Sequence, residues 1–271
     1  MILLIILFLA LINLIVYAQV RHFEFTGWDD PLYVSQNPMV AKGLSWKGVK
    51  WAFSIGHAAN WHPLTWLSHM LDVEIFNLKP GLHHITNVFF HIANSILLFW
   101  LMVRLSADWK RSVFIAALFA AHPLHVESVA WVAERKDVLS TFFLFLTMLA
   151  YVKYLHRPRS RLYYLLTHGL FILALMTIPM AVILPLILLL IDFWPLKRAQ
   201  LEPGQWKIWR QLIREKLALI VLAMISSLIT LVVQRQGGTV AGFEAFPLSM
   251  RAANAMVSYI LYLGNMFWPQ N

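Results

Sequence analysis

The sequence predicts an all-α protein, a polytopic transmembrane helical bundle of about 7–8 membrane segments with further helices at the membrane interface. Three observations predict it. Of the 271 residues, 60% are hydrophobic and only 13% are charged, whereas about a quarter of the residues of a soluble domain are charged. The apolar residues gather in blocks close to the ~20 residues that cross a bilayer. Basic residues occupy short tracts between these blocks, as in proteins whose orientation is fixed by charge.

Apolar segments follow one another along the whole chain. Two short ones are separated by Thr177, Ile178 and Pro179, and are either two tightly connected helices or one broken pair. The last has ~14 residues, which make about 21 Å of helix and are too few to span the ~30 Å hydrocarbon core of a bilayer. We therefore expect the membrane domain, residues 1–271, to be incomplete at its C-terminus. The segments are 2–20, 85–103, 112–130, 138–155, 162–177, 179–194, 217–233 and 255–268.

The first segment could instead be a cleaved signal peptide, since Val16 and Ala18 would suit a signal peptidase. Nothing basic precedes the apolar run, however, and the run is long for a signal peptide. An uncleaved first helix is therefore favoured.

The distribution of charge predicts the orientation. With the N-terminus in the cytoplasm, three short inner loops hold 13 of the 22 Lys and Arg residues, which satisfies the positive-inside rule. Nine of the 13 acidic residues and most histidines fall on the other side. We therefore expect a multi-pass integral membrane protein whose chemistry lies on the periplasmic or lumenal face.

Composition also argues against nucleic-acid binding and against cysteine-based sites. The net charge of +9 does not predict a nucleic-acid partner, because the basic residues are dispersed between apolar blocks. The chain has no cysteine, which excludes disulfides and thiolate metal sites.

The outer segment 21–84 is too long for a simple connector. Its tryptophans are dispersed at spacings that suit amphipathic helices in the interface, where indoles are favoured. We expect it to be a first extracytoplasmic loop with surface helices that packs on the membrane, not a free-standing domain.

Two adjacent carboxylates, Asp29 and Asp30, follow the first segment within Trp28–Pro31. Like charges held at a membrane surface raise one pKa, and such a carboxylate can take a proton from an acceptor hydroxyl. A solvated Asp-Pro turn is the plain alternative.

A polar stripe follows, because His84, Asn87, His91 and Asn94 recur at spacings of three and four and so share one helix face. Polar groups facing lipid are costly, so the stripe is expected to face other helices or a wet cavity. Interhelical hydrogen bonding without any substrate would explain it equally well.

A third group ends the 112–130 segment and continues beyond it. His122, His125 and Glu127 lack the spacing of a helical zinc motif, so no metal or other cofactor is predicted, although a divalent metal would be compatible. Arg135 and Lys136 are cations at the outer interface that can hold a phosphate. The alternative is a solvated, compensated charge cluster, since Glu134 and Asp137 flank them.

Together these residues resemble the transmembrane-and-tetratricopeptide-repeat (TMTC) family and its bacterial relatives, of the GT-C class of glycosyltransferases that use polyprenyl- or dolichyl-phosphate sugars. The resemblance covers nearly the whole chain. Its runs are Trp28 to Pro31, His57 to Asp72, His83 to Asn94, His122 to Ser140 and Asp192 to Leu196.

The resemblance implies a GT-C-like membrane domain whose first outer loop supplies the catalytic acidic residue, Asp29 or Asp30, as general base. It implies transfer of a mannose-like sugar from a lipid phosphate to a protein or glycan hydroxyl. Arg135 and Lys136 would hold the donor phosphate. The substrate pocket would include His62, His84, His91, His122, His125 and Glu127. A tetratricopeptide-repeat region, expected after the membrane part, is absent from this sequence.

One departure favours a different function. Such sequences commonly have Lys-Pro where this chain has Ile178-Pro179. A non-catalytic membrane scaffold or pseudoenzyme of the same fold is therefore the alternative. A transporter is a third possibility, but it predicts polar residues through the full membrane depth and an internal symmetry, and the sequence has neither.

Overall fold

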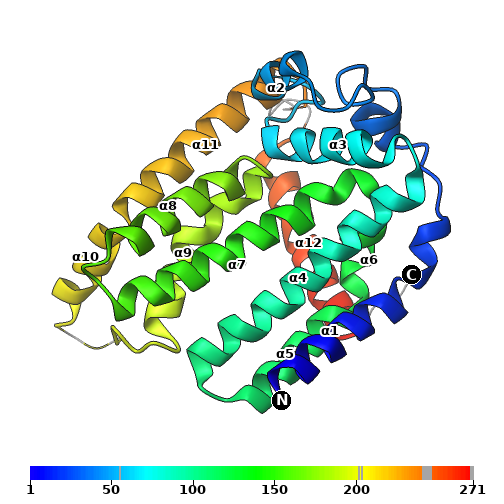
Figure 1. Ribbon diagram of the computed structural model, residues 1–271. Coiled ribbons are helices and arrows are strands. Elements are labelled where there is room, and N and C mark those ends of the chain that lie inside the picture. Colours follow the sequence, from blue (N-terminus) through cyan, green and yellow to red (C-terminus); the bar gives the residue numbers. More distant parts are fainter. Residues whose placement is uncertain (55, 201, 203, 240–245, 269–271) are drawn as a thin grey trace.

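The computed structural model describes residues 1–54, 56–200, 202, 204–239 and 246–268 (Figure 1). Within these ranges the chain is helical and has no β-strand; an isolated bridge joins His57 and Asn60. The all-α prediction is confirmed. The α-helices are α1 (Ile2–Val16), α2 (Trp46–Phe53), α3 (Pro63–Phe76), α4 (Pro80–Ser106), α5 (Trp109–Ala121), α6 (Val126–Ala130), α7 (Arg135–His156), α8 (Arg161–Leu175), α9 (Leu184–Phe193), α10 (Trp206–Glu215), α11 (Leu217–Gln236) and α12 (Leu248–Phe267).

Helix α4 is the axis of the bundle and packs against α1, α5 and α7, while α7 packs against α8 (Figure 1). Pro80 occupies the first turn of α4, where its missing N–H costs nothing. The helix ends at Ala107, which adopts a left-handed φ of 55°. Its 27 residues make it about 40 Å long.

Helices α4 and α7 run in the same direction. The Asn87 side chain donates to the Trp131 carbonyl at 2.8 Å, and the Asn94 side chain donates to the Val138 carbonyl at 2.8 Å. Seven residues separate both the donors and the acceptors, so the two segments are in parallel register. The starts of α4 and α7 therefore lie at one end of the bundle, termed the outer end, and their last turns lie at the inner end.

Three stretches are long and apolar enough to cross a membrane: α4, residues 132–156 including α7, and α11. A fourth would be the pair Trp109–Ala121 and Pro123–Ala130, which is bent by 52°. Shorter apolar helices cover 2–16, 161–175 and 179–193. The predicted apolar segments are helical in the described residues, but fewer than the expected 7–8 are both long and apolar enough to span. Pro123 lies at the break in the bent pair, and Pro179 begins a short turn ahead of α9.

The last predicted segment lies in a helix that is longer than expected. Helix α12 begins at Leu248, seven residues before the predicted start, and has 20 residues, about 30 Å. Arg251 and Asn254 lie inside it; these polar residues interrupt the hydrophobic pattern without interrupting the helix.

The outer segment 21–84 lies against the outer ends of α4 and α7 (Figure 1). Helix α2 is capped at its N-terminus by Ser45, whose side chain accepts a hydrogen bond from Gly48 N. Buried aromatic and aliphatic residues of α2, α3 and the 31–40 stretch pack together with Val132 and Ala133, just before α7. The segment thus shares its core with the helical bundle.

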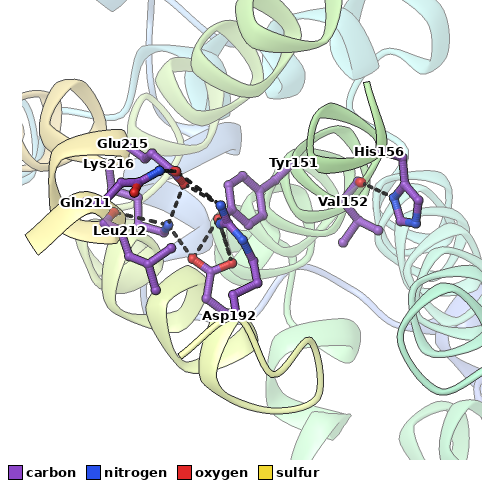
Figure 2. Close-up of polar contacts among 9 residues, drawn as sticks. Tyr151, Val152, His156, Asp192, Gln211, Leu212, Glu215 and Lys216 are labelled. Atoms are coloured by element: carbon purple, nitrogen blue, oxygen red, sulfur yellow. Dashed lines mark hydrogen bonds and ion pairs between the residues drawn. The ribbon is translucent and has the colours of Figure 1, made fainter. Parts of the chain in front are cut away.

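A charged network joins α7, α9 and the α10–α11 junction (Figure 2). Asp192 is fully buried and forms an ion pair with Lys216. The Tyr151 hydroxyl lies 2.8 Å from both Asp192 oxygens. Arg198 bridges Asp192 at 3.0 Å and Glu215 at 2.9 Å. Each buried charge has an opposite charge beside it, so the network fixes these helices to one another.

Candidate functional site

The two adjacent carboxylates have different environments. Asp30 is fully buried, and its Oδ2 accepts hydrogen bonds from Thr26 N at 2.8 Å and Thr26 Oγ1 at 3.1 Å. Its Oδ1 accepts from Ala133 N at 2.9 Å. Asp30 therefore joins the outer segment to the start of α7. Asp29 is exposed, so its carboxylate is accessible to solvent.

Tyr33 is the point where the outer segment and the 132–137 stretch meet. Lys136 Nζ lies 5.6 Å from the centre of the Tyr33 ring, within cation–π range. Burial raises the pKa of Tyr33, and the negative charges of Asp29 and Glu134 raise it further. Lys136 also pairs with Glu134. Asp29 and Lys136, which are 107 positions apart in the sequence, therefore both lie near Tyr33.

Arg135 does not occupy the position predicted for it. Its side chain is fully buried and donates to Asp72 at 2.6 Å, to Ser68 Oγ at 2.8 Å and to the His83 carbonyl at 2.9 Å. It also donates to Asn87. With its donors used in this way, the guanidinium holds α3, α4 and α7 together. The expectation that Arg135 grips a phosphate is corrected; Lys136, whose side chain is 17% exposed, is the cation that reaches the surface.

The polar stripe on α4 faces neighbouring segments, as predicted. All four side chains are buried. His84 lies 3.3 Å from the Glu24 carbonyl and His91 lies 3.3 Å from the Ala120 carbonyl, while the two asparagines bond to Trp131 and Val138 as described above. These contacts give the stripe an interhelical role, because each member satisfies a backbone carbonyl of another segment.

Two histidines of α3 and its N-cap are buried in aromatic surroundings. His62 and His69 are fully buried, and none of their ring nitrogens has a hydrogen-bond partner in the described part of the chain. His62 stacks on Trp66 at 4.7 Å and on Tyr33 at 5.5 Å. Burial, followed by the positive charge of Lys136, lowers the pKa of His62 to about 3. Burial, followed by the charge of Arg135, lowers the pKa of His69 well below its usual value.

Acidification is expected to destabilise this cluster. An unfolded histidine has a pKa of about 6.5, so below that pH the unfolded chain binds protons that folded His62 and His69 reject. Stability is therefore complete above about pH 6.5 and falls with pH toward the folded pKa of His62, about 3. The thermal midpoint of the detergent-solubilised protein, measured between neutral and mildly acidic pH, should fall. The double variant His62→Phe, His69→Phe should show a flatter pH dependence; an equally steep fall would contradict this assignment.

The remaining predicted pocket residues form a second aromatic group. His125 stacks on His91 at 5.3 Å and on Phe119 at 4.4 Å, and lies 6.2 Å from His122. The His122 Nε2 lies 3.0 Å from the Met266 carbonyl of α12. Glu127 is exposed in α6. The candidate pocket residues therefore do not share one place: His91, His122 and His125 form this group, His62 belongs to the Tyr33 group, and His84 lies beside Phe23 and Glu24.

Asp72, Tyr33 and Trp66 were not predicted as site residues. Asp72 pairs with Arg135, while Trp66 and Tyr33 stack at 4.7 Å beside His62. Asp72 and Trp66 both lie inside the His57–Asp72 run, so their place in this run could have identified them as candidate site residues. In the part of the chain that the structure describes, no group of three or more His, Cys, Asp or Glu residues could hold a metal ion.

Comparison with known proteins finds curated proteins that are similar to part of the chain. The chain is 37% identical to mouse protein O-mannosyl-transferase TMTC3 over 94 residues, which cover 35% of this chain and 10% of that protein. It is 28% identical to mouse TMTC2 over 134 residues, which cover 47% of this chain and 16% of that protein. It is 31% identical to mouse TMTC1 over 133 residues, which cover 45% of this chain and 14% of that protein.

The chain resembles the TMTC family. It spans only about a tenth to a sixth of the length of the curated TMTC relatives it matches. No family model and no solved structure matches it.

Proposed function

We propose that this chain transfers a mannose-like sugar from a polyprenyl- or dolichyl-phosphate donor to a hydroxyl of a protein or glycan. The TMTC relatives are named protein O-mannosyl-transferases. The observation that carries the proposal is the exposed carboxylate of Asp29 beside the Tyr33–Lys136 contact at the outer end of the bundle.

In this reaction the acceptor oxygen attacks the anomeric carbon as the bond from that carbon to the phosphate oxygen breaks. Asp29 takes the proton of the acceptor hydroxyl as general base. Lys136 stabilises the negative charge that develops on the departing lipid phosphate. Arg135 positions Lys136 and Glu134 by anchoring the first turn of α7 through Asp72.

The proposal places the site on the periplasmic or lumenal side of a multi-pass protein whose N-terminus is cytoplasmic. The basic inner loops support this orientation. The outer end, where Asp29 and Lys136 lie, is then the extracytoplasmic one, and a lipid-linked donor can reach it from the bilayer.

Transfer from a panel of donors tests the proposal. The full chain in proteoliposomes is incubated with radiolabelled polyprenyl-phosphate mannose, polyprenyl-phosphate glucose or guanosine-diphosphate mannose, together with a detergent-solubilised membrane-protein extract as acceptor. We expect label in protein from one lipid-linked donor and none from the nucleotide sugar. Labelling from the nucleotide sugar alone, or from none of the three, would contradict the proposal.

Lys136→Gln is expected to raise the KM for the lipid-linked donor by about tenfold or more, because it removes one charge-assisted contact to the phosphate. The Asp30–Ala133 hydrogen bond does not involve Lys136 and should keep the fold intact. Initial rates at increasing donor concentration measure the effect. The matched control is Lys79→Gln, on an exposed lysine at the start of α4; an equal rise in both variants would count against a phosphate contact.

The non-catalytic alternative rests on Ile178. This residue caps the turn before Pro179–Ile183, packs partly against the α7–α8–α9 core and lies next to Thr177. The Thr177 carbonyl accepts from Thr65 Oγ1 at 3.0 Å, so the turn lies against the start of α3. If a lysine here is needed for turnover, Ile178→Lys should turn an inactive chain into an active one; activity of the wild type would exclude the scaffold alternative.

A further inference from the structure

A cavity of about 800 Å³ lies at the inner end of the bundle, remote from Asp29. Its walls come from the last turns of α4 and α7 and the first turn of α8. The length of α7, 22 residues, places it about 30 Å from the Asp30–Ala133 contact. It also lies apart from the Asp192 network, because Tyr151 and His156 leave α7 on different sides (Figure 2).

The walls of this cavity carry positive charge. Arg104, Lys153 and Arg157 line it together with His156, and none of its lining residues is acidic. Among the described residues, none of the three permanent cations forms an ion pair with a carboxylate. Lys153 Nζ instead lies 5.8 Å from the centre of the Tyr163 ring. Three uncompensated cations around one cavity attract an anion with several oxygens, such as a phosphate.

A second, apolar cavity of about 280 Å³ continues from the first. The two share Trp100, Arg104, Lys153 and Tyr163. From there the second cavity follows leucines of α7 and α8, namely Leu146, Leu149, Leu166 and Leu170. The combined shape is a cationic chamber with an apolar arm between two membrane helices, which matches a molecule with a charged head and a hydrocarbon chain.

Two aromatic residues stand where head and chain would meet. Trp100 and Tyr163 line both cavities, and such residues are favoured at the level of lipid headgroups. Basic residues at the inner ends of helices would also follow from membrane orientation alone. Orientation does not explain why three of them surround one cavity that opens into an apolar arm.

We propose that this cavity binds a phosphate-bearing lipid, with the phosphate held by Arg104, Lys153 and Arg157 and a hydrocarbon chain lying along the leucines of α7 and α8. The site is separate from the proposed transfer site and does not depend on it. Its position at the junction of α4, α7 and α8 would make the bound lipid a link between these helices at the inner end.

Native mass spectrometry of the full chain in neutral detergent tests the proposal. The probes are phosphatidic acid, polyprenyl phosphate and phosphatidylcholine, and inorganic phosphate is added as a competitor. We expect one molecule of phosphatidic acid or of polyprenyl phosphate to bind tightly. The lipid that binds with the higher affinity identifies which class of phosphate-bearing lipid the site takes. Equal affinity for phosphatidylcholine would overturn the proposal, as would complete displacement by millimolar inorganic phosphate.

Three variants separate a built site from general attraction. Arg104→Gln with Lys153→Gln should weaken binding about tenfold or more, since charge-assisted contacts are lost. Arg159→Gln with Arg161→Gln removes two exposed cations at the junction of α7 and α8 that do not line the cavity and should change binding little. Leu166→Trp should block the apolar arm and weaken lipid binding with every cation in place. Equal losses in both double variants, or unchanged binding in Leu166→Trp, would overturn the proposal.

Discussion

Asp29→Asn is expected to abolish sugar transfer while leaving expression, membrane insertion and the thermal midpoint unchanged. The amide is nearly the same size as the carboxylate but cannot accept the proton of the acceptor hydroxyl, so rate losses of about a hundredfold or more are expected. Because Asp29 is exposed, the fold does not depend on its charge. Transfer of labelled sugar at saturating donor measures the effect.

Glu24→Gln is the matched control, since Glu24 is an exposed carboxylate of the same outer segment. It should transfer at the wild-type rate. Asp30→Asn should instead lower the thermal midpoint, because the Thr26 and Ala133 hydrogen bonds to Asp30 are lost or weakened. Wild-type activity in Asp29→Asn would contradict the assignment of Asp29 as general base. Loss of sugar transfer in Asp30→Asn without any loss of stability would contradict it as well.

Arg135→Gln is expected to cause a larger loss of stability than either Asp30→Asn or Lys136→Gln. It leaves the Asp72 carboxylate, whose side chain is 5% exposed, buried without its counter-charge. Breaking one side of a buried ion pair costs about 3–5 kcal/mol. The thermal midpoint of the detergent-solubilised protein should fall sharply, and less folded protein should be recovered from membranes.

Lys136→Gln provides the comparison, because the Lys136–Glu134 pair is partly exposed and such pairs contribute about 0–1 kcal/mol. The double variant Arg135→Gln, Asp72→Asn should recover part of the stability by removing the uncompensated charge. A phosphate-gripping Arg135 would behave differently: its loss would reduce transfer at unchanged stability, and that result would restore the role predicted from sequence.

Helix positions were largely predictable because hydrophobic pattern determines them. The predicted segment 85–103 lies within α4, 138–155 within α7 and 217–233 within α11. The stripe of His84, Asn87, His91 and Asn94 was correctly predicted to face inward, since helical spacing fixes a common face. Local patterns were sufficient for these features.

Side-chain partners across the fold could not be predicted in the same way. The sequence shows Arg135 beside Lys136 before an apolar run, but only the packing of α3 against α7 decides that Arg135 turns inward to Asp72 and Lys136 does not. The same holds for the adjacent pair Asp29 and Asp30, where the bond to Ala133 selects Asp30 for burial. Sequence located the polar groups; tertiary contacts determine which of them a substrate can reach.

The central claim is that a carboxylate of the outer segment and a cation of α7 share one site. Cysteine cross-linking tests it most directly, because the chain contains no cysteine and introduced pairs react without background. Asp29→Cys with Lys136→Cys is treated in membranes with a short bifunctional maleimide, alongside the control pair Asp29→Cys with Arg104→Cys, which joins opposite ends of the bundle. We expect intramolecular cross-linking of the Asp29–Lys136 pair and none of the control. Cross-linking of the control pair, or none of the Asp29–Lys136 pair although both cysteines are labelled, would contradict the claim.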